Sequence, residues 1–559
     1  MTAQAAGPGA GGDRQARPRR TGRLGLAASA VSIALTFAVA ACGPSVMEPA
    51  LPGRAGQPPW FVAVRPSPYL MVAMTAVALA AGTAGLALTM HAARRGWSVP
   101  PRLVLAAGII LAAALALVPP IGSADHLSYA AYGRMVTTGH NPFTTTPAAL
   151  ARLGDPVARA VQDWRTSPSD YGSLATGGQA LASLIGGTSV RLTVFVLSLL
   201  NVTAFAVTGL LLHWLARGDR ARQFRAALLW TANPLLLQVL VAGAHVDSQA
   251  IVFCIAALAV YAIGIYNGAP RASLARQALA AAGAGALIGL GFAVKVSMAL
   301  AGAGLAIACV VAWRWRHLAE LEQAASVRPS RWREPAALLG GLAAGFGLTA
   351  GASVAVWGPG SLRPALRAGS YVSIGSPWRA VRSALRLVTG EPVAEDVVKA
   401  AAIVLAVALL VLLMRSVRVL DPGVGPGTGH EFRPAALPAA AVFAVAFAWL
   451  LAWPYVLPWY DGLGWALLAL LPWSRLDWLL LARTSALAFG YLPARGIVMP
   501  AGLGWLRTVV RTGVTPVILL AVIVALVMML WPWRQTVLRP PAEGDSAGTA
   551  RARISGLPS

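Results

Sequence analysis

The chain has 559 residues, of which 57% are hydrophobic and only 12% carry charge. Soluble domains carry about 25% charged residues on their surfaces, so this composition excludes a soluble enzyme and indicates that lipid surrounds most of the chain. The formal net charge of +25 comes almost entirely from Arg, because Lys occurs only at Lys295 and Lys399. No basic face with interleaved aromatic residues indicates nucleic-acid binding, and the Arg residues instead cluster between apolar segments, as in cytoplasmic loops.

The two ends of the chain differ in composition from the rest. Residues 1–23 and 537–559 are rich in Gly, Ala, Pro, Ser and Arg, a composition typical of disordered segments. We expect both to be cytoplasmic tails, and residues 24–536 to form one polytopic membrane domain. Residues 421–430 (DPGVGPGTGH) predict a flexible cytoplasmic turn inside that domain.

Apolar segments long enough to cross a bilayer recur along the membrane domain. Lipid offers the backbone no hydrogen-bond partners, so such segments must be helices. The sequence therefore predicts an all-α polytopic membrane protein with about 12–14 transmembrane helices. Two adjoining pairs leave alternatives open: the seventh and eighth segments could form one long tilted helix, and the twelfth and thirteenth a re-entrant hairpin. The fourteen segments are 24–41, 69–92, 103–119, 190–214, 224–244, 247–266, 278–293, 296–313, 335–357, 398–414, 434–453, 462–474, 476–492 and 513–533.

The Arg distribution predicts the orientation of these segments. Five Arg residues precede the first segment and place the N-terminus in the cytoplasm. When the chain is threaded from there, the Arg-rich short loops and the C-terminal tail all lie inside. The two long loops, 120–189 and 358–397, lie outside. This arrangement predicts a multi-pass protein of the plasma membrane.

The first apolar segment ends Val39-Ala40-Ala41-Cys42-Gly43 after an Arg-rich leader, which is similar to a lipoprotein cleavage site. The alternative interpretation is the plain end of the first span. We favour the second, because one lipid chain adds little to the anchoring of a protein with many spans.

Polar and ionisable residues at the membrane edge are costly and usually functional. With the orientation above, the unusual ones lie on the outer side of the bundle, in the first long loop and in four short outer turns. We therefore expect an outward-facing polar pocket built from Asp125, Tyr129, Arg134, His245, Asp247, Lys295, Trp459 and Tyr460.

Several short motifs occur in a fixed order and together resemble a known family, the actinobacterial polyprenyl-phosphomannose-dependent α-1,6-mannosyltransferases of the GT-C class. One of the family's patterns, Ser-Pro-Tyr-Gly-Pro, is interrupted here by Ser169-Asp170. The matching residues are Asp125 with Tyr129 and Gly133-Arg134, Gly139-His140-Asn141-Pro142-Phe143, Trp164 with Ser167-Pro168 and Tyr171-Gly172, Asn233-Pro234-Leu235, Gly243-Ala244-His245-Val246-Asp247, Val294-Lys295-Val296 and Trp459-Tyr460.

The resemblance implies a GT-C-like bundle and an inverting transfer of mannose from a polyprenyl phosphate to an acceptor outside the cytoplasm. It implies that Asp125, in the first outer loop, is the general base that takes the acceptor's proton. The alternative interpretation of Asp125 is a helix cap. Arg134 and Lys295 are candidates for the leaving phosphate. The alternatives are an ion pair with Asp163 or a lipid for Arg134, and snorkelling for Lys295.

The remaining pocket residues have two interpretations each. His245 and Asp247 are candidates for phosphate or acceptor contacts, or shape a helix turn. Their spacing alone does not make a metal site, so we predict no metal ligands and leave a divalent-metal cofactor open. Trp459 and Tyr460 are candidates to stack on sugar rings, or anchor the chain at the interface.

The predicted function is a mannosyltransferase with a polyprenyl-phosphate-linked donor, a glycolipid or polysaccharide acceptor, membrane lipids as surroundings and no nucleic-acid partner. The alternatives are a transferase for another lipid-linked sugar, a transporter or flippase, and a non-catalytic assembly partner. A transporter usually shows two related halves and charges at mid-membrane, which this sequence lacks.

Overall fold

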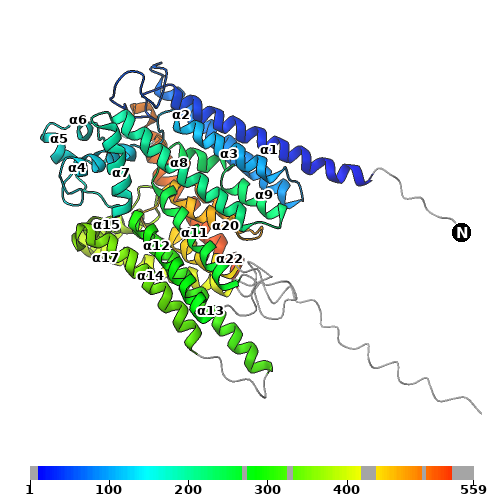
Figure 1. Cartoon of the computed structure of the whole chain (residues 1–559). Helices are drawn as coiled ribbons and strands as arrows, with labels where there is room; N and C mark the ends of the chain where they lie inside the picture. The colour runs from blue at the N-terminus through cyan, green and yellow to red at the C-terminus, as the bar shows by residue number, and fades with distance from the viewer. Residues whose placement is uncertain (1–9, 267–272, 324–331, 417–435, 494–498, 532–559) are drawn as a thin grey trace, which may run out of the picture.

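The computed structural model describes residues 10–266, 273–323, 332–416, 436–493 and 499–531. Within these ranges every regular element is helical, as the composition predicts. The long helices run roughly parallel or antiparallel to one another in an elongated bundle (Figure 1). The predicted turn at 421–430 and the predicted C-terminal tail at 537–559 lie outside the described residues.

Ten helices in the described ranges are long and apolar enough to cross a membrane, and two shorter apolar helices, α3 (Pro101–Ala116) and α19 (Ala436–Ala452), lie among them. The protein is therefore a multi-pass membrane protein, and the prediction of an all-α polytopic chain is confirmed. The ten are α1 (Ala10–Ala41), α2 (Pro68–Arg94), α8 (Val190–Leu215), α9 (Arg220–Leu229) with α10 (Pro234–Leu236) and η1 (Leu237–Val241), α11 (Asp247–Tyr266), α12 (Leu274–Val294), α13 (Ala299–Gln323), α14 (Arg333–Trp357), α17 (Glu391–Arg415), and η7 (Leu506–Val514) with α22 (Thr515–Leu530).

The two adjoining pairs of predicted segments are resolved differently. Between α12 and α13 the chain breaks at Lys295, which has an extended backbone, so the alternative of one long tilted helix is wrong. The other pair forms α20 (Asp461–Leu468) and α21 (Leu476–Gly490). Both are shorter than the roughly 20 residues that a straight crossing needs, and their side chains are mostly buried inside the bundle.

The first helix begins earlier than the sequence predicts. Helix α1 starts at Ala10, within the segment 1–23 that its composition assigns to a disordered tail. The stretch contains the strong helix formers Ala, Arg and Gln as well as Pro18, and the helix continues through it past the apolar segment. Figure 1 shows this part of α1 projecting beyond the ends of its neighbours.

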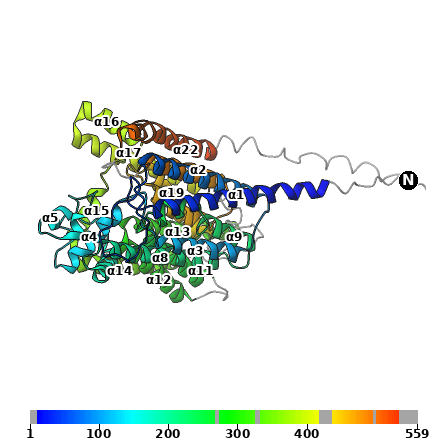
Figure 2. The same ribbon diagram turned by 90° about the horizontal axis from the view of Figure 1, so that it is seen from above.

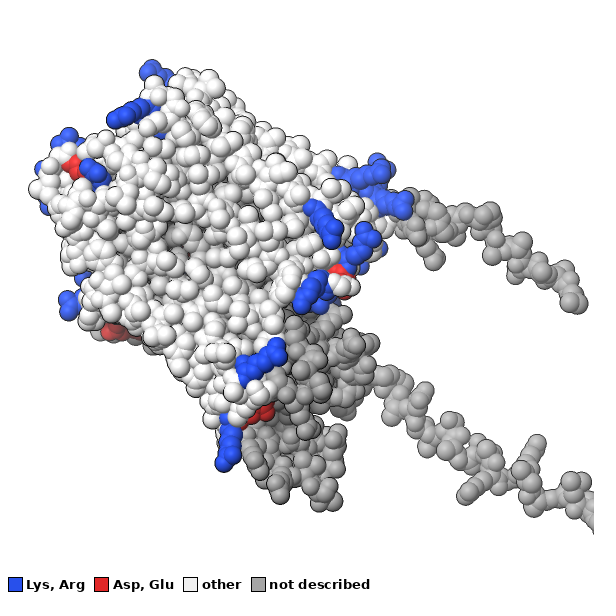
Figure 3. Space-filling view, viewed as in Figure 1, with Lys and Arg blue, Asp and Glu red and all other residues white. Residues whose placement is uncertain are grey.

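Charged side chains on the visible face gather at the two ends of the bundle, and a broad uncharged band separates them (Figure 3). This is the distribution expected when the band faces lipid and the ends face water.

In the described part of the two long loops, the chain forms six shorter α-helices. Helices α4–α7 follow α3 and lie together at one end of the bundle, opposite the end toward which α1 projects (Figure 1). Helices α15 and α16 follow α14, and they fall in the second long loop of the sequence. The bounds are α4 (Asp125–Thr137), α5 (Pro147–Arg152), α6 (Pro156–Arg159), α7 (Ser173–Gly186), α15 (Arg363–Ala368) and α16 (Trp378–Thr389).

Candidate active site

A cavity of about 260 Å³ opens at the end of the bundle that carries α4–α7. Three segments that are far apart in the sequence line it: the start of α4 with residues 164–171, helix α15 with Tyr371, and the turn at 455–460. We call this space the polar cavity. Its walls carry carboxylates, one guanidinium, hydroxyl groups and several aromatic rings, which is a lining suited to a polar ligand with apolar faces.

Asp125 is the first residue of α4 and lines the polar cavity. Ser123 Oγ accepts a hydrogen bond from the backbone N–H of Asp125 at 3.0 Å. Ala124 occupies the capping position. The interpretation of Asp125 as the helix cap is therefore wrong. The indole of Trp164 hydrogen-bonds to the carboxylate, whose side chain is only 13% exposed.

The surroundings of Asp125 favour its protonated form. The pKa of Asp125 is raised from its usual 3.8 to about 7; burial is the largest cause, and the negative charges of Asp163 and Asp170 act in the same direction. The Trp164 hydrogen bond and the positive charge of Lys295 oppose this shift. A carboxylate with a pKa near 7 is half ionised at neutral pH and can take up a proton, as a general base must.

His245 lies beside Asp125 in the turn between η1 and α11. Its Nδ1 is 3.7 Å from Asp125 Oδ2, and its ring stacks on Trp459 with centroids 3.5 Å apart. Burial, followed by the charge of Lys295, lowers the pKa of His245 well below its usual value, so the imidazole is neutral. The turn itself is held by Asn201, whose side-chain amide donates to the Ala244 carbonyl at 2.7 Å.

Lys295 is fixed between two other predicted site residues. Its Nζ donates to Asp247 Oδ1 at 2.7 Å and lies 3.8 Å from the centroid of the Tyr460 ring. This geometry arises because α12 ends at Val294 and Lys295 is extended. The side chain points into the protein and is 15% exposed, so Lys295 forms a buried ion pair here.

Aromatic side chains from both halves of the chain surround the carboxylate. The Tyr171 hydroxyl donates to the Tyr129 hydroxyl at 3.2 Å, and the two rings meet edge to face. On the other wall Trp164 stacks on Tyr371, with centroids 5.8 Å apart. Aromatic rings beside carboxylates can contact the apolar face of a sugar, while the carboxylates accept hydrogen bonds from its hydroxyl groups.

A buried network holds the turn that bears Trp459 and Tyr460. Asp461 starts α20 and forms a buried ion pair with Arg483 of α21. The Thr484 hydroxyl donates to Asp461 Oδ2 at 2.7 Å. Because a buried ion pair with satisfied partners is costly to break, these contacts fix the position of the turn against the polar cavity.

Two residues at the site have a left-handed backbone that side chains larger than Gly rarely adopt. Trp164 has φ 59° and Ala244 has φ 51°. Such conformations cost about 1–3 kcal/mol each and persist where the surrounding structure enforces them, often at functional sites. Here they direct the Trp164 indole at Asp125 and the next residue, His245, at Trp459.

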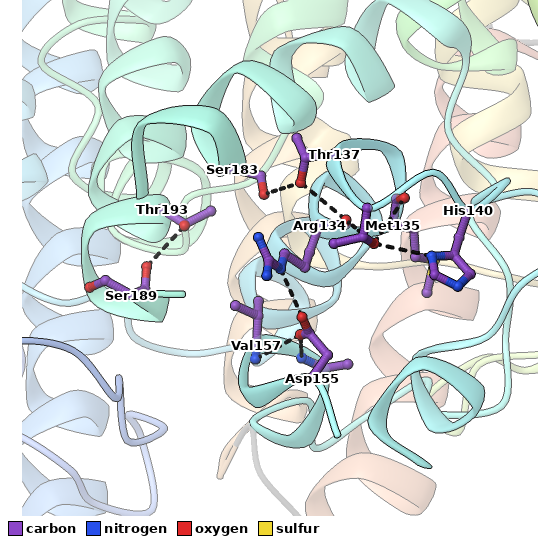
Figure 4. A network of polar contacts seen from close by, with 11 residues as sticks. Arg134, Met135, Thr137, His140, Asp155, Val157, Ser183, Ser189 and Thr193 are labelled. Atoms are coloured by element: carbon purple, nitrogen blue, oxygen red, sulfur yellow. Dashed lines mark hydrogen bonds and ion pairs between the residues drawn. The ribbon is translucent and has the colours of Figure 1, made fainter. Parts of the chain in front are cut away.

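Arg134 lies away from the polar cavity. Its Nε donates to Asp155 Oδ2 at 2.7 Å (Figure 4), and Asp155 also caps α6 by accepting from the backbone N–H of Val157. The partner of Arg134 is thus Asp155 rather than Asp163, and the residue ties α4 to α6. Arg134 follows Asp125 by nine residues, which at about 3.6 residues per turn places it on the opposite face of the helix.

The structure thus brings seven of the eight predicted residues together and leaves out Arg134. It adds cavity-lining residues that the sequence alone did not single out as site residues, among them Asp170, Arg367 and Tyr371. The interruption of the family pattern at Ser169-Asp170 is a signal that could have indicated Asp170. Arg367 and Tyr371 lie in the second long loop, where no motif marks them.

No three His, Cys, Asp or Glu side chains in the described ranges are close enough to hold a metal ion.

The fold and the polar cavity together define a multi-pass membrane protein with a buried candidate base at one end of its helical bundle. The chain belongs to the α-(1→6)-mannopyranosyltransferase family: the model described as "Alpha-(1->6)-mannopyranosyltransferase, N-terminal domain" matches residues 23–312. The predicted family resemblance is confirmed. The matched range contains Asp125, His245 and Lys295, whereas the turn with Trp459 and Tyr460 lies beyond it.

Curated relatives with this name show modest similarity. The chain is 28% identical to α-(1→6)-mannopyranosyltransferase A of Corynebacterium glutamicum over 129 residues, which are 23% of this chain and 26% of the relative. It is 34% identical to an α-(1→6)-mannopyranosyltransferase of Mycobacterium tuberculosis over 137 residues, which are 23% of this chain and 22% of the relative. The chain thus matches about a quarter of the length of these relatives.

One solved structure is similar at a lower level, the archaeal oligosaccharyltransferase AglB from Archaeoglobus fulgidus in complex with an inhibitory peptide and a dolichol-phosphate. The similarity covers 75% of this chain and 55% of AglB, with 15% sequence identity and a TM-score of 0.32. A TM-score of this size is too low to establish a shared fold.

Proposed function

We propose that the protein is a GT-C-type mannosyltransferase of the plasma membrane. It transfers mannose from a polyprenyl phosphate to a glycolipid or polysaccharide acceptor outside the cytoplasm. Family membership supports the sugar and the linkage. The observation that carries the reaction is Asp125, a carboxylate with a raised pKa at the wall of a cavity lined with aromatic rings.

The proposed reaction inverts the anomeric carbon in one step. Asp125 takes the proton of the acceptor hydroxyl as that oxygen forms a bond to C1 of a β-linked mannose. The bond from C1 to the phosphate oxygen breaks on the opposite face, and its electron pair leaves with the lipid phosphate. The acceptor attacks one face of the sugar ring and the phosphate leaves from the opposite face, as in inverting glycosidases.

His245 has a supporting part in this step. A neutral imidazole 3.7 Å from the carboxylate adds no positive charge that would lower the basicity of Asp125. Its stacking on Trp459 fixes one wall of the polar cavity. We assign it the role of a positioning residue.

The extracytoplasmic location follows from the positive-inside rule. The Arg-rich start of α1 belongs in the cytoplasm, and the polar cavity lies at the other end of the bundle. A transporter is less well supported, because the charged residues that line the cavity lie at one end rather than on broken helices at mid-membrane.

The proposed function is tested by measuring mannose transfer in membranes that contain the protein. Radiolabelled polyprenyl-phosphomannose is supplied, and label is followed into lipid-linked mannan. Asp125→Asn should lower the initial rate by about 10²–10⁴-fold, whereas Asp396→Asn, an exposed carboxylate of α17, should leave it unchanged. Transfer at the normal rate by Asp125→Asn would show that Asp125 is not the base, and a wild-type chain without transfer would favour an assembly partner.

A further inference from the structure

Arg367 is the one basic side chain among the described residues that line the polar cavity. It lies on α15 and is exposed, and no described carboxylate forms an ion pair with it. Lys295, by contrast, forms an ion pair with Asp247. A guanidinium offers several N–H donors in a planar fork that fits the oxygens of a phosphate.

A second cavity of about 160 Å³ lies nearby and is mostly apolar, with Ser376 and Arg483, the latter paired with Asp461, as the polar side chains of its lining. It is formed where α16, α17 and α22 approach one another, helices that also lie close together in Figure 2. We call it the apolar pocket. Its lining includes Trp378, Leu405, Leu451, Trp453 and Leu520.

One extended segment separates the two cavities. Tyr455 and Leu457 line the polar cavity, whereas Val456 between them lines the apolar pocket. Alternate side chains of an extended segment point to opposite sides, so the wall is a single layer of backbone. Ser373 braces this wall: its Oγ donates to the Val456 carbonyl at 2.8 Å and accepts from the Val456 N–H at 2.9 Å.

The apolar pocket also reaches the helix that bears Arg367. A Cβ built on Gly369 would lie 3.9 Å from the Trp453 ring, and Gly369 is two residues beyond Arg367. Trp453 of the apolar pocket therefore lies near the end of α15, the helix that carries Arg367. Leu520, which is 49% exposed, opens the pocket toward the surface that faces lipid.

We propose that Arg367 binds the phosphate of the lipid carrier and that the apolar pocket holds the part of its hydrocarbon chain next to the phosphate. This inference rests on the proposed function for the identity of the ligand. In this arrangement one lipid-linked sugar occupies both cavities. Its sugar lies in the polar cavity toward Asp125, and its phosphate lies at the rim of that cavity. Its hydrocarbon chain lies on the far side of residues 453–457. Such a chain is the apolar occupant that a membrane-embedded pocket can take from the bilayer.

The experiment measures binding of radiolabelled, sugar-free polyprenyl phosphate to the full chain in lipid nanodiscs, so that no transfer is needed. Arg367→Gln should weaken binding at least tenfold, because the charge-assisted contacts are lost. Arg367→Lys should recover part of the loss. The matched control is Arg363→Gln on the same helix, which does not line the polar cavity and should bind within twofold of wild type.

The second part of the experiment tests binding of the hydrocarbon chain with substitutions at two positions of α22. Leu520→Trp fills the apolar pocket and should also weaken binding about tenfold. Val524→Trp lies one turn further on at a comparably exposed position, 54% exposed, outside the pocket, and should bind as wild type does. Normal melting temperatures of all variants show that the effects are local.

A competition experiment tests whether the site is specific for polyprenyl phosphate. Excess phosphatidylglycerol or inorganic phosphate should not displace the label, and displacement by either would overturn the proposal in favour of a general anion site. Wild-type binding by Arg367→Gln or by Leu520→Trp would overturn it as well, even if transfer is normal. A chain that binds the lipid phosphate through Arg367 but transfers no mannose would contradict the proposed function alone.

Discussion

Asp125 shows what burial costs the residue that we propose as the general base. Its carboxylate ionises readily in the unfolded chain, at the usual pKa of 3.8, but only near pH 7 in the folded protein. The folded state therefore gains relative stability from this group at low pH, and loses it as the pH rises through 7 and the buried carboxylate must ionise. The fold thus gives up stability at the position of the proposed base.

Removing this charge should therefore stabilise the protein. We expect Asp125→Asn to melt at an equal or higher temperature than wild type at about pH 8, and to lose this advantage at about pH 5, where the wild-type carboxyl is protonated. Melting of the purified protein in detergent measures this. A clear loss of stability at pH 8 would show that the ionised carboxylate is held by favourable contacts instead.

His245 offers a second test at the scale of single residues. One substitution can keep a stacked ring while it removes the nitrogen atoms, and another can remove both. His245→Phe keeps the stacking on Trp459 and removes Nδ1 near Asp125. We expect the melting temperature to stay near that of wild type and kcat to fall about tenfold, the worth of one polar contact to a charged group. His245→Ala, which also loses the stacking, should lower both quantities. Equal kcat values for wild type and His245→Phe would leave the histidine a purely structural role.

At the scale of single elements, the periodicity of α4 explains which residues the sequence could indicate. Tyr129 follows Asp125 by four residues and shares its face of the helix, so the motif indicated both. Arg134 belongs to the same motif, but its helical phase turns it toward α6. Arg367 could not be found in this way, because its approach to the polar cavity depends on the packing of α15 against the turn near Tyr455.

The contact between Arg134 and Asp155 predicts a structural phenotype. Arg134→Ala removes a partly buried ion pair that also holds the cap of α6. We expect a loss of about 1–2 kcal/mol in the free energy of unfolding, seen as a lower melting temperature, with no change in KM for the lipid donor. A raised KM at unchanged stability would instead return Arg134 to the phosphate-binding role that its motif suggests.

For the whole molecule, composition and apolar length were sufficient to predict a helical membrane protein, and ten of the fourteen predicted segments correspond to described helices long enough to cross a membrane. Apolar length and the need of the backbone for internal hydrogen bonds act along the sequence itself. The polar cavity was predictable only as a convergence of residues on one side. Its volume, the second cavity and the role of Asp461 in fixing the turn depend on contacts between α19, α20 and α21, which no local pattern records.

The predicted orientation of the bundle can be measured by labelling single cysteines in intact cells. In a background without Cys42, Cys254 and Cys309, a membrane-impermeant maleimide should label a cysteine at Arg363. A cysteine at Arg217 should react only after the membrane is opened, because the loop after α8 lies in the cytoplasm in this arrangement. Labelling of both positions from outside would contradict the threading.

In the proposed mechanism Asp125, with its raised pKa, takes the acceptor's proton during mannose transfer. The most direct measurement is the initial rate of transfer by the purified protein from about pH 5 to about pH 9, for wild type and Asp125→Asn. We expect the wild-type rate to rise with pH to a plateau with an apparent pKa of about 7, and the rate of Asp125→Asn to stay low and not to follow this curve. A wild-type rate already at its plateau at pH 5, or the same rising curve in Asp125→Asn, would contradict the proposed mechanism.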